Sequence, residues 1–197
     1  MIQDITIRKG STFADTIYYA QPVLTVKPIT GITKSGQAVV TSAGHGVAVD
    51  WWAWIVGAAG MDKINHRAED LKNLNKAYRA YYVDANTLRL DLDTSRFSTY
   101  TSGGELLYLP PVDLTGYTAR MQIRQPDADG VVVHSLTTED GGLTLSANGE
   151  INRLISAAAT ELFDFECGVY DLELVSAAGV VTPIVRGSVE LQDEVTK

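Results

Sequence analysis

The stretch Asp113–Arg124, DLTGYTARMQIR, carries the pattern that decides the fold of this 197-residue chain. Apolar side chains alternate with polar ones along it, at Tyr117, Ala119, Met121 and Ile123. The stretch Gly168–Ser176, GVYDLELVS, repeats the alternation at Tyr170, Leu172 and Leu174. A period of two places every second side chain on the same face, which is typical of strands with one buried face. The two stretches therefore predict a β-sandwich whose core takes up these apolar side chains.

Two further stretches of the C-terminal portion are LTTEDGGLTL (residues 136–145) and VRGSVELQDEVT (residues 185–196). Together with the first two, they resemble the small sandwich domains that phage virion proteins use at baseplates and fibre attachment points. The N-terminal domain of the baseplate upper protein is one such domain. The resemblance implies an immunoglobulin-like β-sandwich that acts as a binding scaffold rather than as an enzyme.

The N-terminal residues predict two strands, Ile5–Arg8 and Phe13–Tyr19, which have no partner strands nearby in the sequence. We expect them to complete the sandwich, which then comprises residues 1–28 and 107–197. Residues 29–106 form an insertion. Proline cannot donate a hydrogen bond to a sheet, and prolines mark both ends of the insertion, at Pro22, Pro28, Pro110 and Pro111.

One short helix is expected across residues 157–163, AAATELF. Ser156 precedes it and supplies a hydroxyl that can cap the first turn. Ala158 and Leu162 lie four residues apart and are expected to face the sandwich.

The insertion contains its own ordered set of short stretches, ITGITKSGQAVVTSAGHG, IVGAAGM, INHR, ANTLRLD and YTSGG. In this order they resemble a small β-barrel module of phage tail and fibre proteins. That module is related to the first catalytic-cysteine half-domain of ubiquitin-activating enzymes, and the resemblance implies no ubiquitin chemistry. The chain departs from the module at His66, where a glycine is usual, and in an extra loop at residues 68–76. We expect the turn at His66 to be remodelled, because histidine tolerates positive φ less well than glycine does.

Composition limits the classes of function. The formal charge is −8 and the pI is about 4.8, which argues against a surface that neutralises nucleic-acid phosphates. The single cysteine, Cys167, excludes an internal disulfide and suits folding in the reducing cytoplasm of a host cell. No segment approaches the roughly 18 apolar residues that membrane insertion requires, and we expect no export signal.

No group of residues indicates catalysis, a cofactor or a metal. The histidines, His45, His66 and His134, show no ligand spacing, and the serines lack a Gly-x-Ser-x-Gly motif. His45 is expected to bond backbone groups in a turn. The pairs Asp91 with Asp93 and Asp127 with Asp129 do not continue into a calcium-binding loop, so we interpret them as turn or strand-end carboxylates.

The tryptophans Trp51, Trp52 and Trp54 are the candidate partner-binding residues. If Ala53 and Ile55 face inward, Trp52 and Trp54 share the outer face and form an interface anchor. A second interpretation uses them to cover the barrel core or its junction with the sandwich. A third is a sugar-stacking platform, which also requires polar groups nearby.

These patterns favour a non-enzymatic phage virion protein, an adaptor of the tail, baseplate or fibre-attachment apparatus that acts by protein–protein binding. Its expected partners are other virion proteins, and copies of the chain are expected to form a symmetric homo-oligomer. The alternative is a carbohydrate-binding adhesin that meets the host surface, or a head-decoration module.

Overall fold

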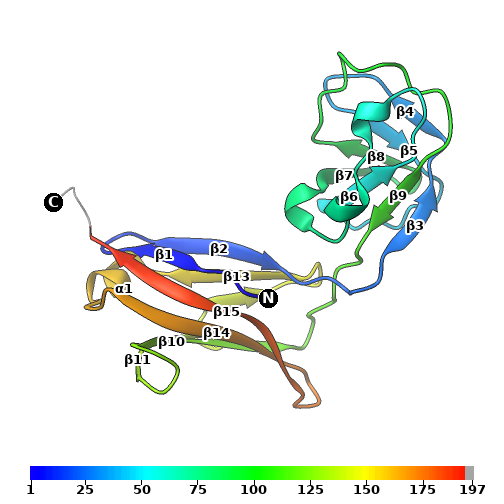
Figure 1. Ribbon diagram of the computed structural model, residues 1–197. Helices are drawn as coiled ribbons and strands as arrows, with labels where there is room; N and C mark the ends of the chain where they lie inside the picture. The colour runs from blue at the N-terminus through cyan, green and yellow to red at the C-terminus, as the bar shows by residue number, and fades with distance from the viewer. Residues whose placement is uncertain (194–197) are drawn as a thin grey trace. The chain divides into compact units, whose positions relative to one another are not determined.

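The structure, a computed structural model, describes residues 1–193 and contains two compact units (Figure 1). Met1–Tyr19 and Val112–Lys197 form the first, here called the sandwich unit. Ala20–Pro111 form the second, the inserted unit. Residues 194–196, at the end of the stretch VRGSVELQDEVT, lie outside the described residues. Within these, the chain is mostly strand with one short α-helix, which confirms the expected all-β fold.

The sandwich unit consists of two sheets and the helix. Its elements are β1 (Ile5–Arg8), β2 (Phe13–Tyr18), β10 (Thr118–Gln125), β11 (Val131–Thr137), β12 (Leu143–Leu145), β13 (Glu150–Ile155), α1 (Ala157–Glu161), β14 (Cys167–Val175) and β15 (Val181–Gln192). One sheet has the order β1-β15-β14-β10-β11 and the other the order β12-β13-β2. The strands predicted at Ile5–Arg8 and Phe13–Tyr19 are present, with ends within one residue of those expected, and the two alternating stretches contain most of β10 and most of β14.

The alternating side chains fill the space between the two sheets, as the sequence predicted. Met121 on β10 is 1% exposed and lies opposite Leu172 on β14, which is fully buried. Both belong to one cluster with Ile17 and Ile151 of the other sheet. Period-two alternation therefore placed the correct face of both strands in the core.

The N-terminal strand joins the sheet through a parallel pairing, in which Ile5 lies opposite Val189 of β15. The terminal ammonium donates to the carbonyl of Ile184 at 3.0 Å, and the Asp4 carboxylate accepts the Ser188 N–H at 2.9 Å. This hydrogen bonding lowers the pKa of Asp4. The partners of β1 and β2 thus come from the C-terminal portion, as expected.

Helix α1 has the predicted cap, because the Ser156 Oγ accepts the Ala159 N–H at 3.2 Å. The predicted orientation is wrong. Leu162 is 82% exposed, whereas Thr160 and Phe163 are buried. The Thr160 hydroxyl donates to the carbonyl of Ser11 at 2.8 Å, so that face of the turn is held against the sandwich and Leu162 points away.

The inserted unit is a seven-stranded sheet with three short 3-10 turns. Its elements are β3 (Thr25–Pro28), β4 (Gly31–Thr33), β5 (Val39–Thr41), β6 (Trp51–Val56), η1 (Asp62–Ile64), η2 (Ala68–Asp70), η3 (Leu74–Lys76), β7 (Tyr78–Asp84), β8 (Thr87–Leu90) and β9 (Glu105–Tyr108). The strand order is β3-β9-β6-β7-β8-β5-β4. Its two end strands, β3 and β4, follow one another in the chain and are separated only by Ile29 and Thr30.

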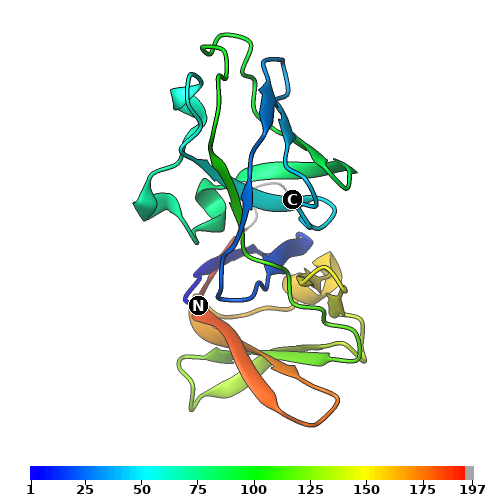
Figure 2. The same cartoon turned by 90° about the vertical axis from the view of Figure 1, so that its right-hand side faces the viewer.

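The boundary between the units differs from the expected one. Residues 20–28 and 107–111 belong to the inserted unit, and β3 pairs with β9 rather than with a sandwich strand. The two strands run side by side in both views, β3 in blue and β9 in green (Figure 1, Figure 2). Prolines mark the loops near this boundary, but only strand pairing decides which sheet a strand joins.

We expect the sandwich unit to fold without the insertion. The Val112 N–H donates to the Tyr19 carbonyl at 3.0 Å, so the two ends of the excised segment already meet. Replacing Ala20–Pro111 by a short Gly/Ser linker leaves the core cluster complete and closes only a short loop. Circular dichroism should show a β spectrum with one cooperative thermal transition. A random-coil spectrum would contradict the division into units.

Candidate binding surface on the inserted unit

Strand β6 carries the three tryptophans, and all of its side chains except Trp52 and Val56 are buried. Trp51, Ala53 and Ile55 share one face and are fully buried. The Trp51 Nε1 donates to the carbonyl of Leu109 at 2.6 Å, so its polar atom is satisfied inside the unit. Trp51 is therefore a core residue of the inserted unit.

Trp54 does not lie on an outer face, which corrects the sequence prediction. It is fully buried and forms a cluster with Leu107 and Leu109. Leu71, Leu74 and Ala77, all from the extra loop and its end, pack against this cluster. The loop covers the face of β6 that alternation had assigned to solvent. Within the described residues, the buried Trp54 Nε1 has no hydrogen-bond partner.

His66 ties this loop to β6. Its Nδ1 accepts the Ile55 N–H at 3.1 Å, and its Nε2 lies 2.9 Å from the Lys76 carbonyl. An Nδ1 that accepts leaves the proton on Nε2, which then donates to Lys76. The backbone of His66 does not adopt a positive φ. Among the described non-glycine residues, Asp50 and Lys72 do. His66 therefore avoids the positive φ that it would tolerate poorly, and a remodelled turn relative to the module stays a prediction.

Trp52 follows Trp51 on β6 and is half-buried, and its ring meets that of Trp51 edge to face with the ring centres 5.2 Å apart. It pairs across the strands with Arg79 on β7, whose guanidinium carbon lies 4.1 Å from the centre of a Trp52 ring. Tyr81 pairs with Arg89 on β8 in the same way, at 5.1 Å. Arg79 and Tyr81 are two residues apart on one strand, so all four side chains share one face. We call these four residues the aromatic–arginine face.

The aromatic–arginine face has the chemistry of a protein interface. Tryptophan, tyrosine and arginine are the residue types enriched where single side chains contribute most to binding. Stacking on a ring holds each guanidinium near a fixed position, which reduces the entropy lost when it meets a carboxylate. The opposite side of these strands is core, with Ala80, Leu88 and Leu90 fully buried, so the face rests on a rigid support.

His45 fulfils the role expected of it. Its Nδ1 accepts the Val47 N–H at 3.0 Å, and its Nε2 lies 2.8 Å from the Asp84 carbonyl. Both ring nitrogens are therefore engaged by backbone groups, and His45 itself is fully buried. Burial lowers the pKa of the third histidine, His134, whose ring lies 5.4 Å from that of Phe163.

The aspartate pairs form turns. Asp93 accepts the Ser95 N–H at 2.8 Å, and Asp127 accepts the Asp129 N–H at 3.0 Å. Hydrogen bonding to Ser95, through its side chain and its backbone, lowers the pKa of Asp93. A search of residues 1–193 finds no group of three or more His, Cys, Asp or Glu side chains placed to hold a metal ion.

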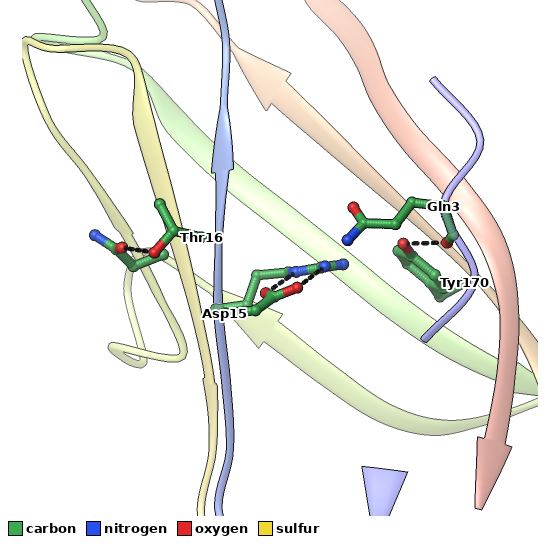
Figure 3. A network of polar contacts seen from close by, with 6 residues as sticks. Gln3, Asp15, Thr16 and Tyr170 are labelled. Carbon is green, nitrogen blue, oxygen red and sulfur yellow. Dashed lines mark hydrogen bonds and ion pairs between the residues drawn. The ribbon is translucent and has the colours of Figure 1, made fainter. Parts of the chain in front are cut away.

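The most deeply buried charge is Arg153 on β13, inside the sandwich unit. Its guanidinium binds the Asp15 carboxylate through two hydrogen bonds, one of them 2.6 Å long, and lies over the Tyr170 ring. Asp15 points to the interior, Thr16 points to the other side of β2, and the Tyr170 hydroxyl donates to the Gln3 carbonyl at 2.7 Å (Figure 3). Burial, the largest single effect, would lower the pKa of Arg153, but hydrogen bonding and charge interactions with Asp15 and Tyr170 together outweigh it and raise the pKa. The pair joins two neighbouring strands of one sheet, β2 and β13, and the contact of Arg153 with the Tyr170 ring reaches the other sheet.

The outer face of the five-stranded sheet is polar and internally paired. Arg120 donates twice to Glu173, at 2.8 and 2.9 Å, and Arg124 donates to Gln122 and to the Gly130 carbonyl. Such exposed pairs are typical of a solvated face and contribute little to stability.

Across the described residues there is no helix long and apolar enough to cross a membrane.

No family model matches this chain. No curated protein matches it either.

Sequence reasoning missed three of the four residues of the aromatic–arginine face, Arg79, Tyr81 and Arg89. The sequence predicts only a strand at Tyr78–Val83, YRAYYV. Its alternation of Arg79, Ala80 and Tyr81 already predicts that the arginine and the tyrosine share a face. The partners on β6 and β8 depend on strand register, which the sequence did not provide.

Proposed function

We propose that this chain is a non-enzymatic structural adaptor of a phage tail, baseplate or fibre-attachment apparatus, and that it acts by protein–protein binding. The aromatic–arginine face carries the proposal, because it joins tryptophan, tyrosine and two arginines on a rigid sheet. The resemblance of both units to phage virion modules supports the setting. In this assignment the partners are other virion proteins, and the chain is located in the particle.

We also propose that the sandwich unit is immunoglobulin-like and that the inserted unit is barrel-like. An immunoglobulin-like sandwich is supported by the sheet orders β1-β15-β14-β10-β11 and β12-β13-β2, which separate the strands much as immunoglobulin domains do. A barrel-like form of the inserted unit is supported by its end strands, β3 and β4, which the chain itself connects.

The alternative of a carbohydrate-binding adhesin is less well supported on this face. A sugar stacks on an uncovered aromatic ring, whereas the Arg79 guanidinium lies 4.1 Å from the centre of the Trp52 ring. Arg89 lies over Tyr81 in the same way. The rings therefore orient cations, and the face is better suited to carboxylates of a protein partner than to neutral sugars.

Mass spectrometry of purified phage particles tests the proposal. The particles are produced in a host that carries the phage genome encoding this chain. We expect the wild-type chain in the particles. The double variant Arg79→Glu with Arg89→Glu should fold but be lost from them, because removal of a central contact weakens an interface by about thirtyfold or more.

The matched control is Lys34→Glu with Arg96→Glu, which makes the same change in charge at exposed positions of the same unit. It should enter the particles normally. Absence of the wild-type chain from particles would refute the adaptor. Incorporation of the Arg79 and Arg89 variant at the wild-type level would refute the assigned surface.

A further inference from the structure

The net charge of the chain is divided unequally between the two units. The sandwich unit has 16 acidic and 7 basic residues, whereas the inserted unit has 8 acidic and 9 basic residues. Their formal charges are therefore −9 and +1. The acidic character of the protein comes entirely from the sandwich unit.

One part of the sandwich unit carries acidic residues with no basic residue between them in the sequence. No lysine or arginine occurs from Leu154 to Val185. Exposed carboxylates follow one another at the end of α1 and in its connection to β14, at Glu161, Asp164 and Glu166. Glu190 on β15 lies opposite Cys167, so it adjoins the end of that connection. We call these four residues the acidic edge. In the part of the chain that the structure describes, the carboxylates in ion pairs are those of Glu69, Glu173 and Asp15, and none of them belongs to the acidic edge.

The acidic edge and the aromatic–arginine face complement one another in chemistry. Guanidinium groups bind carboxylates through two parallel hydrogen bonds, and the rings beneath Arg79 and Arg89 hold them for this. The two surfaces belong to different units, and every copy of the chain carries both. A contact between unlike surfaces of two copies leaves one of each free, so that it repeats into a ring or a filament.

We propose that the aromatic–arginine face of one copy docks on the acidic edge of a second copy. This inference rests on the proposed function and names the partner of the same surface. The charge of −8 on each copy repels at long range, but salt at physiological strength screens charges separated by more than about 8 Å. Carboxylate–guanidinium pairs in direct contact are screened much less.

A charge exchange in the full chain, followed by sedimentation velocity, tests this docking. One variant carries Arg79→Glu with Arg89→Glu, and the other carries Glu161→Lys, Asp164→Lys and Glu166→Lys. We expect the wild type to associate as its concentration rises, and each variant alone to associate at least about tenfold more weakly. An equimolar mixture should associate again, because the reversed surfaces complement one another. The control Lys34→Glu with Arg96→Glu should behave as the wild type, and circular dichroism should confirm that every variant is folded.

Two outcomes would overturn the inference. A wild-type chain that stays monomeric at the highest measurable concentration has no such contact. If that monomeric chain still enters particles through Arg79 and Arg89, the surface binds a different virion protein and the proposed adaptor function stands. Failure of the mixture to associate, when the wild type does so, would show that copies meet through other surfaces.

Discussion

Replacing Trp54 by alanine should lower the free energy of unfolding of the inserted unit by about 3–5 kcal/mol. The side chain is fully buried in a cluster that the extra loop closes, so its removal leaves a cavity and unties Leu71 and Leu74 from the sheet. For a unit of this size, the melting temperature should fall by about 12 °C or more. Because the two units have separate cores, differential scanning calorimetry should show the shift in one transition only.

Two other substitutions sharpen the Trp54 prediction. Trp54→Phe should cost much less than alanine, since it keeps most of the ring volume and removes an Nε1 donor that has no partner in the described residues. Trp52→Ala should change the stability of the free chain by only a small amount, because this side chain is half-buried on the outer face. A larger loss of stability from Trp52→Ala than from Trp54→Ala would contradict the burial assigned to these two side chains.

Removing the carboxylate of Asp15 should destabilise the sandwich unit by about 3 kcal/mol or more. Asp15→Ala leaves the guanidinium of Arg153, whose side chain is fully buried, without its anion. The Nη1 of Arg153 already lacks a hydrogen-bond partner in the described residues, so the structure offers little else to compensate the charge. Urea denaturation of the chain, followed by circular dichroism, would measure this loss.

The double variant Asp15→Leu with Arg153→Met provides the control. It removes both charges together and fills the space with apolar atoms, so it should recover most of the stability that Asp15→Ala loses. A double variant as unstable as Asp15→Ala would mean that the site depends on shape and hydrogen bonds to Tyr170 rather than on the balance of charge.

Much of the sandwich unit follows from local sequence. The alternation in Asp113–Arg124 and Gly168–Ser176 predicts which side chains are buried, because a strand with one wet face must place every second residue inside. The cap at Ser156 and the bonding of His45 to backbone groups follow from side-chain chemistry in the same way. The alternation and the cap depend on neighbours in the sequence, whereas His45 also contacts the carbonyl of Asp84, which is distant in the sequence.

The candidate site was only partly predictable. The tryptophans predicted a binding surface on β6, and Trp52 does belong to the aromatic–arginine face. The exposed position that alternation predicted for Trp54 is instead covered by a loop. Whether a loop folds over a strand depends on contacts between residues that are distant in the sequence, and no local period records them. Leu162 on α1 was misplaced for the same reason, since a tertiary hydrogen bond from Thr160 fixes the orientation of that turn.

The sequence by itself determined the all-β character, the strand ends of the sandwich unit and the division of charge along the chain, since strand period, capping and net charge are local or additive properties. Only the tertiary structure decided that β3 joins the inserted unit, that Arg153 finds Asp15, and that Trp52 lies beneath Arg79. Each of these depends on which strand lies beside which and in what register. Register is fixed by the packing of the whole core, so it cannot be inferred from one strand alone.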